Sequence, residues 1–148
     1  MTVSAESVIA ARRAESLLDR VKRHEGWRPR PYKCTAGKLT VGYGFNLEDR
    51  DLPQSIASLW LAYLLQDAEL RLHHLGLLHW VLSDVQKEVI VEMMFQLGAP
   101  RFMSFVRMCD CLRRGAVDYV PVEMLDSKWA REDCPSRARE LADLFRTG

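Results

Sequence analysis

The chain lacks the local patterns that mark a zinc protein or a disulfide-stapled domain. It has only four cysteines and four histidines in 148 residues. Cys109 and Cys111 are separated by a single residue, which is too close for structural zinc ligands, and no two histidines have the HExxH spacing. We therefore expect free thiols, and neither a metal nor another cofactor.

Long apolar runs are also missing. Arg12, Arg13 and Asp19 are among the charges that interrupt the only candidate for a signal peptide. The apolar stretch 56–65 is too short to span a bilayer. These absences predict a protein that accumulates in the cytoplasm of the cell that makes it and does not insert stably into a membrane.

The charges nearly balance, at a net charge of +1, but they are unevenly distributed. Residues 1–38 hold nine Lys/Arg against four Asp/Glu, whereas residues 39–100 hold three against eight. A basic amino-terminal part suits an anionic polymer, either cell wall or nucleic acid, although a solvated helix face explains it equally well. Because no nucleic-acid-binding motif accompanies the charge, we expect no nucleic acid partner.

What the sequence does contain is helix-forming segments around one short region of strand character. With 48% apolar residues, 1–148 is expected to form a single domain of the α+β class, mainly α. A first helix, capped by Ser4 or Ser7, is predicted to end at Glu25 before Gly26, and two short strands around a turn at Gly37 are predicted within residues 31–45. Further helices are expected over 53–74, 83–97, 101–113, 116–125 with a break at Pro121, and 136–145, with a polar linker over 131–135.

Glu25 is the first candidate for chemistry because of its place at a helix end. The carbonyl end of a helix carries partial negative charge, which favours the protonated form of a carboxyl group, as a general acid requires. On position alone, an ordinary salt-bridged surface glutamate is the simpler interpretation.

The spacing around Glu25 changes that interpretation. Eight residues separate Glu25 from Cys34 and five more separate Cys34 from Thr40, in the run HEGWRPRPYKCTAGKLTVGYG. Here the sequence resembles the phage T4-type lysozymes (endolysins), and the resemblance extends over about residues 18–148. Further segments that resemble the family are FQLG at 95–98, FVRM at 105–108, SKW at 127–129, PSRA at 135–138 and FRTG at 145–148.

The resemblance implies a lysozyme-like fold in which a small β-hairpin lobe (26–52) is joined by a long helix (53–75) to a larger helical lobe (76–148). It implies hydrolysis of the β-1,4 bond between N-acetylmuramic acid and N-acetylglucosamine in peptidoglycan. Glu25 would protonate the glycosidic oxygen and Thr40 would hold a water. Phe95 and Gln96 align with positions lining the cleft, and Arg137 aligns with an arginine that salt-bridges the catalytic glutamate, so these three are the expected substrate-binding residues.

Cys34 departs from the commoner family pattern, which has an aspartate at this position. An ionised thiol is able to stabilise the transition state or attack carbon directly, whereas a neutral thiol only helps to place water. A small buried thiol with no chemical role is the remaining alternative. Phe45 also departs from the pattern, replacing a histidine, and we expect it to affect local packing.

Two other functions fit the same resemblance. A wall-binding or effector domain without turnover is the alternative that the missing carboxylate keeps open. A lytic transglycosylase would need Glu25 alone, and the presence of Thr40 at its spacing argues against it. As in relatives, we expect a monomer that acts on the cell wall in the periplasm and stays in the host cytoplasm until a separate holin-like protein releases it at lysis.

Overall fold

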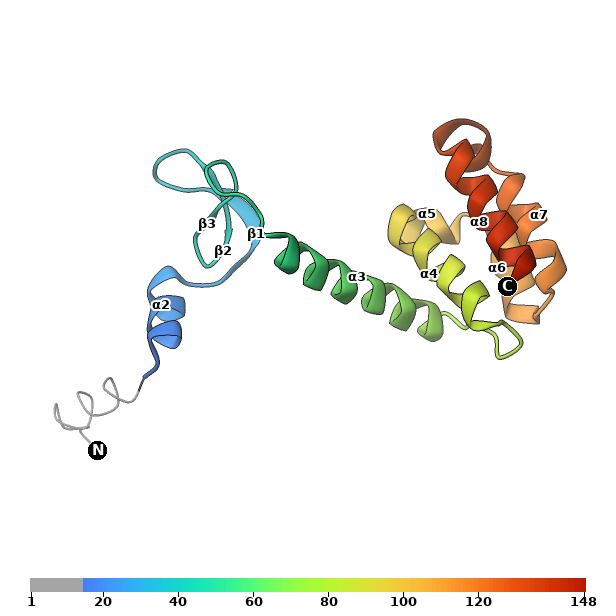
Figure 1. Ribbon diagram of the computed structural model, residues 1–148, viewed down its shortest axis with the longest axis horizontal. Helices are drawn as coiled ribbons and strands as arrows, with labels where there is room; N and C mark the ends of the chain where they lie inside the picture. Colours follow the sequence, from blue (N-terminus) through green and yellow to red (C-terminus); the bar gives the residue numbers. More distant parts are fainter. Residues whose placement is uncertain (1–14) are drawn as a thin grey trace. The chain divides into compact units, whose positions relative to one another are not determined.

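The computed structural model describes residues 15–148, which form helices and one small antiparallel sheet (Figure 1). This confirms the α+β, mainly α class. No helix within these residues has the length and apolar character needed to cross a membrane. The chain divides into two compact units, the first ending at Ile56 and the second covering Ala57–Gly148. The elements, in order, are α2 (Leu17–Glu25), β1 (Arg28–Lys33), β2 (Leu39–Gly42), β3 (Phe45–Asn46), α3 (Gln54–His74), α4 (Asp84–Leu97), α5 (Ala99–Met103), α6 (Val106–Arg114), the 3₁₀ helix η1 (Val117–Tyr119), α7 (Val120–Leu125), the π-helix η2 (Trp129–Asp133) and α8 (Pro135–Thr147).

The helix that ends at Glu25 starts later than the sequence predicted. Ser16 has an extended backbone and its hydroxyl accepts the Asp19 N–H at 3.1 Å, so Ser16 is the cap and the helix begins at Leu17. The predicted start at Ser4 or Ser7 lies outside the described residues. The predicted end is confirmed, because Gly26 has φ 70° and its N–H bonds to the Lys22 carbonyl at 2.9 Å.

The sheet has three strands in the order β1-β2-β3, all antiparallel. The two strands predicted around Gly37 are confirmed, with Tyr32 opposite Thr40 in the register. The sequence missed β3, because a strand of two residues is too short to show an alternating pattern. In β3, Asn46 pairs with Thr40, so β2 is the central strand and holds Thr40 between two neighbours.

The two strongest predicted helices are confirmed. In α4, the Gln86 N–H donates to the Ser83 hydroxyl and the Ser83 N–H donates to the Gln86 side-chain oxygen, both at 3.1 Å. This reciprocal capping box fixes the start of the helix, and Gly98 ends it. Such signals are local, which explains why α4 begins and ends within a residue of the predicted positions. The ends of α3 also lie within a residue of the prediction.

The predictions for the carboxy-terminal third need three corrections. The single helix expected over 101–113 is wrong, because the chain breaks at Ser104 and Phe105 into α5 and α6. The break predicted at Pro121 lies one residue earlier: η1 ends at Tyr119, and Pro121 lies in the first turn of α7, which proline tolerates. The expected linker over 131–135 is also wrong, because residues 129–133 form η2 and α8 begins at Pro135.

The hydrophobic core lies in the second unit, where α8 packs against α4, α7 and η2. Trp129 is 2% exposed and makes an edge-to-face contact with Phe105, with ring centroids 6.3 Å apart. Such close packing makes α4 and α8 a rigid support for the polar side chains on their outer faces. The largest fully buried side chains beside Trp129 are Phe102, Phe145, Leu72, Leu77, Ile90, Met93, Met108, Leu112 and Met124.

Candidate active site

Within the first unit, the Glu25 carboxyl group lies against the backbone of Gly44. A Cβ atom added to Gly44 would be 2.7 Å from Glu25 Oε2 and 3.4 Å from its Cδ. Gly44 also has φ 73°, in the left-handed region that favours glycine. The turn between β2 and β3 therefore approaches the end of α2 closely, and a side chain at position 44 would displace the carboxyl group.

Cys34 and Thr40 are brought together by the β1–β2 turn. The Cys34 N–H donates to the Lys38 carbonyl at 2.9 Å, and the Gly37 N–H donates to the Cys34 carbonyl at 2.8 Å. These bonds fold the chain back so that Thr40, which is 3% exposed, reaches the side of Cys34. The spacing of five residues between them is therefore the length of one tight hairpin connection.

The surroundings of Cys34 favour its ionised form. Hydrogen bonds from the backbone of Lys38, then of Ala36, and from the Thr40 hydroxyl lower the pKa of the Cys34 thiol. The Thr40 hydroxyl has a single proton and two acceptors, since it also donates to the Lys38 carbonyl at 3.0 Å. Ionisation of the sulfur makes it the stronger acceptor, so we expect the hydroxyl proton to turn toward a thiolate.

The lowered pKa predicts selective alkylation of Cys34. As the pH is raised, iodoacetamide should modify Cys34 first, with its half-maximal rate below the ordinary cysteine pKa of about 8.5. Cys109 should react last, because it is 1% exposed and burial raises the pKa of its thiol. Peptide mass spectrometry after timed labelling measures each site. In Thr40→Val the midpoint for Cys34 should move upward, and an unchanged midpoint would contradict a role for the hydroxyl.

Three aromatic rings lie beside the turn that approaches Glu25, and the sequence interpretation had singled out only one of them, Phe45. Trp27 and Tyr43 have ring centroids 5.2 Å apart, and Phe45 meets Tyr43 edge-on at 6.4 Å. Phe45 therefore contributes to local packing, as expected. The sequence signal for Trp27 was its position next to Gly26, and the signal for Tyr43 was its position between Gly42 and Gly44.

An ion pair and an asparagine hold the loop that follows β3. Lys38 pairs with Asp49, which raises the pKa of the Lys38 ammonium group. The Asn46 side-chain oxygen accepts the N–H groups of Glu48 and Asp49 at 2.8 and 3.1 Å. These contacts tie the end of β3 back to the turn that contains Cys34.

The predicted substrate-binding residues all belong to the second unit. Phe95, which is 39% exposed, and Arg137 line a groove of about 1250 Å³ formed by α3, α4 and α8. Gln96 does not line it: its amide donates to the Cys134 sulfur at 3.1 Å and its buried oxygen has no partner among residues 15–148. Arg137 donates to Glu92, at 2.9 Å from Nε and 2.7 Å from Nη2, and its pairing with Glu25 stays a prediction.

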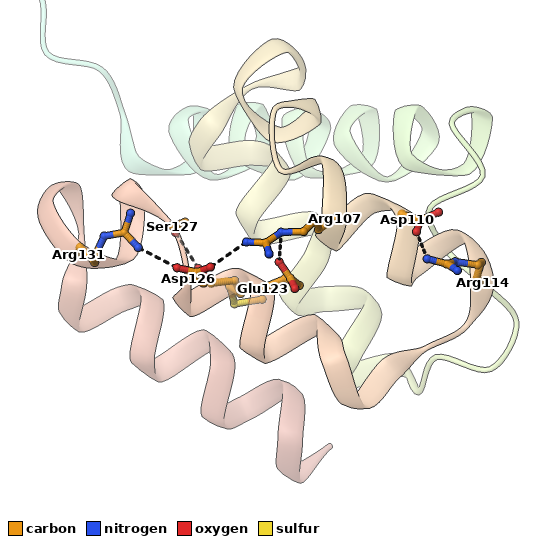
Figure 2. A network of polar contacts seen from close by, with 8 residues as sticks. Arg107, Asp110, Arg114, Glu123, Asp126, Ser127 and Arg131 are labelled. Atoms are coloured by element: carbon orange, nitrogen blue, oxygen red, sulfur yellow. Dashed lines mark hydrogen bonds and ion pairs between the residues drawn. The ribbon is translucent and has the colours of Figure 1, made fainter.

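A second cavity, of about 450 Å³, lies between α6, α7 and η2. Four of its charged side chains pair with one another, as Figure 2 shows: Arg107 bonds to Glu123 at 2.9 Å and to Asp126 at 2.8 Å, and Arg131 bonds to Asp126 at 3.0 Å. These four side chains neutralise each other and link α6 to α7 and η2, but three of them are more than half exposed, so water screens the pairs and they add little stability. Within the described part of the chain, no three His, Cys, Asp or Glu side chains gather as a metal site would require.

Comparison with known proteins finds one family model that matches most of the chain. The family model described as Phage lysozyme matches residues 22–144, a range that includes Glu25, Cys34, Thr40, Phe95, Gln96 and Arg137. No curated protein matches the chain.

Proposed function

From the premise that this chain belongs to the phage lysozyme family, we propose that it hydrolyses the β-1,4 bond between N-acetylmuramic acid and N-acetylglucosamine. The family places it among the peptidoglycan-hydrolysing endolysins, which are glycoside hydrolases. The bond and the residues that cut it are our proposal. We assign Glu25, Cys34 and Thr40 to catalysis, and Phe95 and Arg137 to direct substrate binding. Gln96, whose amide is bonded to Cys134, we assign only to the support of that surface beside Phe95.

The observation that most supports the proposal is the contact between the Glu25 carboxyl group and the backbone of Gly44. A general acid must be held at a fixed position relative to the bond that it protonates. Here the turn after β2 limits the position of the carboxyl group on the side of Gly44. Trp27 and Tyr43 beside it offer the aromatic surface on which sugar rings commonly pack.

In the proposed mechanism, the Glu25 proton passes to the glycosidic oxygen as the bond from that oxygen to the anomeric carbon breaks. The leaving sugar gains a hydroxyl group, and the other sugar becomes an oxocarbenium-like species. Two courses then remain. Either the Cys34 thiolate takes a proton from a water that Thr40 holds and the water attacks, or the thiolate itself attacks and water later cleaves the thioglycoside, with Glu25 now acting as a base.

Digestion of purified peptidoglycan tests the proposal. We expect mass spectrometry to find muropeptides with reducing-end N-acetylmuramic acid, and NMR of the first product to show which anomer forms. An α anomer indicates direct attack by water, and a β anomer indicates attack by Cys34. Anhydro products would instead indicate a transglycosylase. Cys34→Ser should slow both courses, because serine is not ionised near neutral pH.

Gly44→Ala should reduce the rate of this digestion by about 10²-fold, because the new methyl group would push the Glu25 carboxyl group out of position. Gly76→Ala is the matched control: Gly76 has a similar φ of 66°, yet an added Cβ meets nothing within 4 Å, and Gly76 lies outside the turn that brings Cys34 and Thr40 together. Both variants should lose about 1 kcal/mol of stability from backbone strain. Equal activity of the two variants would contradict a role for the Gly44 contact.

A wall-binding or effector protein without turnover is the second candidate, and the thiol in place of a carboxylate favours it. This candidate predicts that purified sacculi bind the protein but release no muropeptides. The monomeric state, residence in the cytoplasm until lysis, and release by a holin-like protein stay predictions from the resemblance. Expression with and without a membrane-permeabilising protein tests the last of these, since lysis should require both.

A further inference from the structure

Glu92 and Arg137 form a pair that connects α4 to the first turn of α8. Arg137 directs Nε and Nη2 to the same oxygen, Oε1 of Glu92, at 2.9 and 2.7 Å. The second oxygen of Glu92 accepts no hydrogen bond from the described residues. Both side chains line the groove on the second unit that Phe95 also lines. The pair is thus part of the surface to which the predicted substrate-binding residues belong.

The exposure of both side chains indicates that the pair contributes little to the stability of the fold. The Arg137 and Glu92 side chains are 43% and 40% exposed, and ion pairs of this kind contribute little because water screens them and both side chains lose freedom. What the pair does determine is the direction of a long, flexible side chain. With Nε and one N–H of Nη2 held by Glu92, the guanidinium plane is fixed and its other N–H groups stay available for a ligand.

The backbone of Glu92 is itself firmly placed. Its neighbours Met93 and Met94 are buried in the core, at 0% and 2% exposure, and the capping box at Ser83 fixes the start of α4. Phe95 follows Glu92 by three residues, so the two lie near each other on one side of the helix. The Arg137 side chain is therefore oriented by the same rigid helix, α4, that carries Phe95.

We propose that Glu92 is a positioning residue, which orients the Arg137 guanidinium toward the polar groups of the peptidoglycan strand. This inference rests on the proposed function and on the assignment of Arg137 to substrate binding. Loss of Glu92 would leave Arg137 present but free to take several orientations. Part of the free energy of substrate binding would then be lost in ordering the Arg137 side chain.

Steady-state kinetics on soluble, uncrosslinked glycan strands tests the proposal. We expect Glu92→Ala to raise KM about 5-fold with little change in kcat, since the lost interaction acts on binding. Glu92→Gln keeps an oxygen that accepts from Arg137 and should restore most of the affinity. Asp143→Ala is the matched control, because Asp143 accepts from Arg146 at 2.8 Å on the same helix, α8, and does not line the groove.

A fall in the melting temperature of Glu92→Ala with an unchanged KM would overturn the proposal and leave a structural ion pair. The same applies if Asp143→Ala raises KM equally. If the wild-type protein hydrolyses no strand, the proposed function fails instead. Sedimentation with purified sacculi then decides the role of Glu92, since weaker binding by Glu92→Ala than by Glu92→Gln supports positioning and equal binding refutes it.

Discussion

Glu25→Gln should lower the rate of peptidoglycan hydrolysis by about 10²- to 10⁴-fold, the range that general acid catalysis contributes. Glutamine has nearly the shape of glutamic acid and fits the same space beside Gly44, but it has no proton to give to the glycosidic oxygen. Without that proton the leaving sugar must depart as an alkoxide. Release of reducing ends from purified peptidoglycan measures the rate, and circular dichroism checks that the fold is unchanged.

Glu15→Gln is the control for this prediction. The Glu15 carboxylate accepts from Arg23 at 3.0 and 2.9 Å, and this bond lowers the pKa of the Glu15 carboxyl group, so it is an ion-pair partner on the same unit. It should retain wild-type activity. If Glu25→Gln also retained it, Glu25 would not be the acid. If neither variant nor the wild type released reducing ends while all three bound sacculi, the wall-binding function would replace hydrolysis.

Trp129→Ala should destabilise the second unit by about 3–5 kcal/mol, the cost usually found for removing a large aromatic side chain from a core. Trp129 is 2% exposed, so its removal leaves a cavity, and the edge-to-face contact with Phe105 is lost as well. Urea unfolding followed by circular dichroism measures the change. Circular dichroism is preferable to fluorescence because Trp129 is itself a fluorophore.

Trp129→Phe separates the packing of the ring from its polar atom. The indole N–H of Trp129 is buried and has no hydrogen-bond partner among residues 15–148, so its removal relieves an unpaired polar group. We therefore expect a loss clearly smaller than that of Trp129→Ala, because phenylalanine still fills much of the site. A loss as large as that of Trp129→Ala would show that the N–H is paired, for example with a water.

The secondary structure could be predicted from the sequence where its signals are local. The capping box at Ser83 and the glycines at 26 and 98 act within one helical turn. For this reason the start of α4 and the carboxy-terminal ends of α2 and α4 were predicted correctly. The break at Ser104 and the π-helix at 129–133 were missed. Both lie where the chain bends to bury Phe102 and Trp129, so packing overrides local preference there.

The candidate site, too, could be predicted from the sequence only in part. The spacing of Glu25, Cys34 and Thr40 along the chain, with its resemblance to a known family, was sufficient to identify the catalytic candidates and the class of reaction. A helix end and a hairpin connection are short-range structures, so residue spacing alone determines which side chains they present. The same spacing, however, gave no sign that Gly44 touches the Glu25 carboxyl group.

Only the tertiary structure determined the partners of the more distant residues. Glu92 and Arg137 are 45 positions apart and Gln96 and Cys134 are 38 apart, and each pair meets because α8 packs on α4. Hydrogen-bonded partners so far apart depend on how helices pack, and packing depends on the whole core rather than on any local pattern. The sequence by itself therefore determined the ends of α4, the hairpin and the choice of catalytic candidates, while the packed core decided that Arg137 pairs with Glu92 and that Gln96 bonds to Cys134.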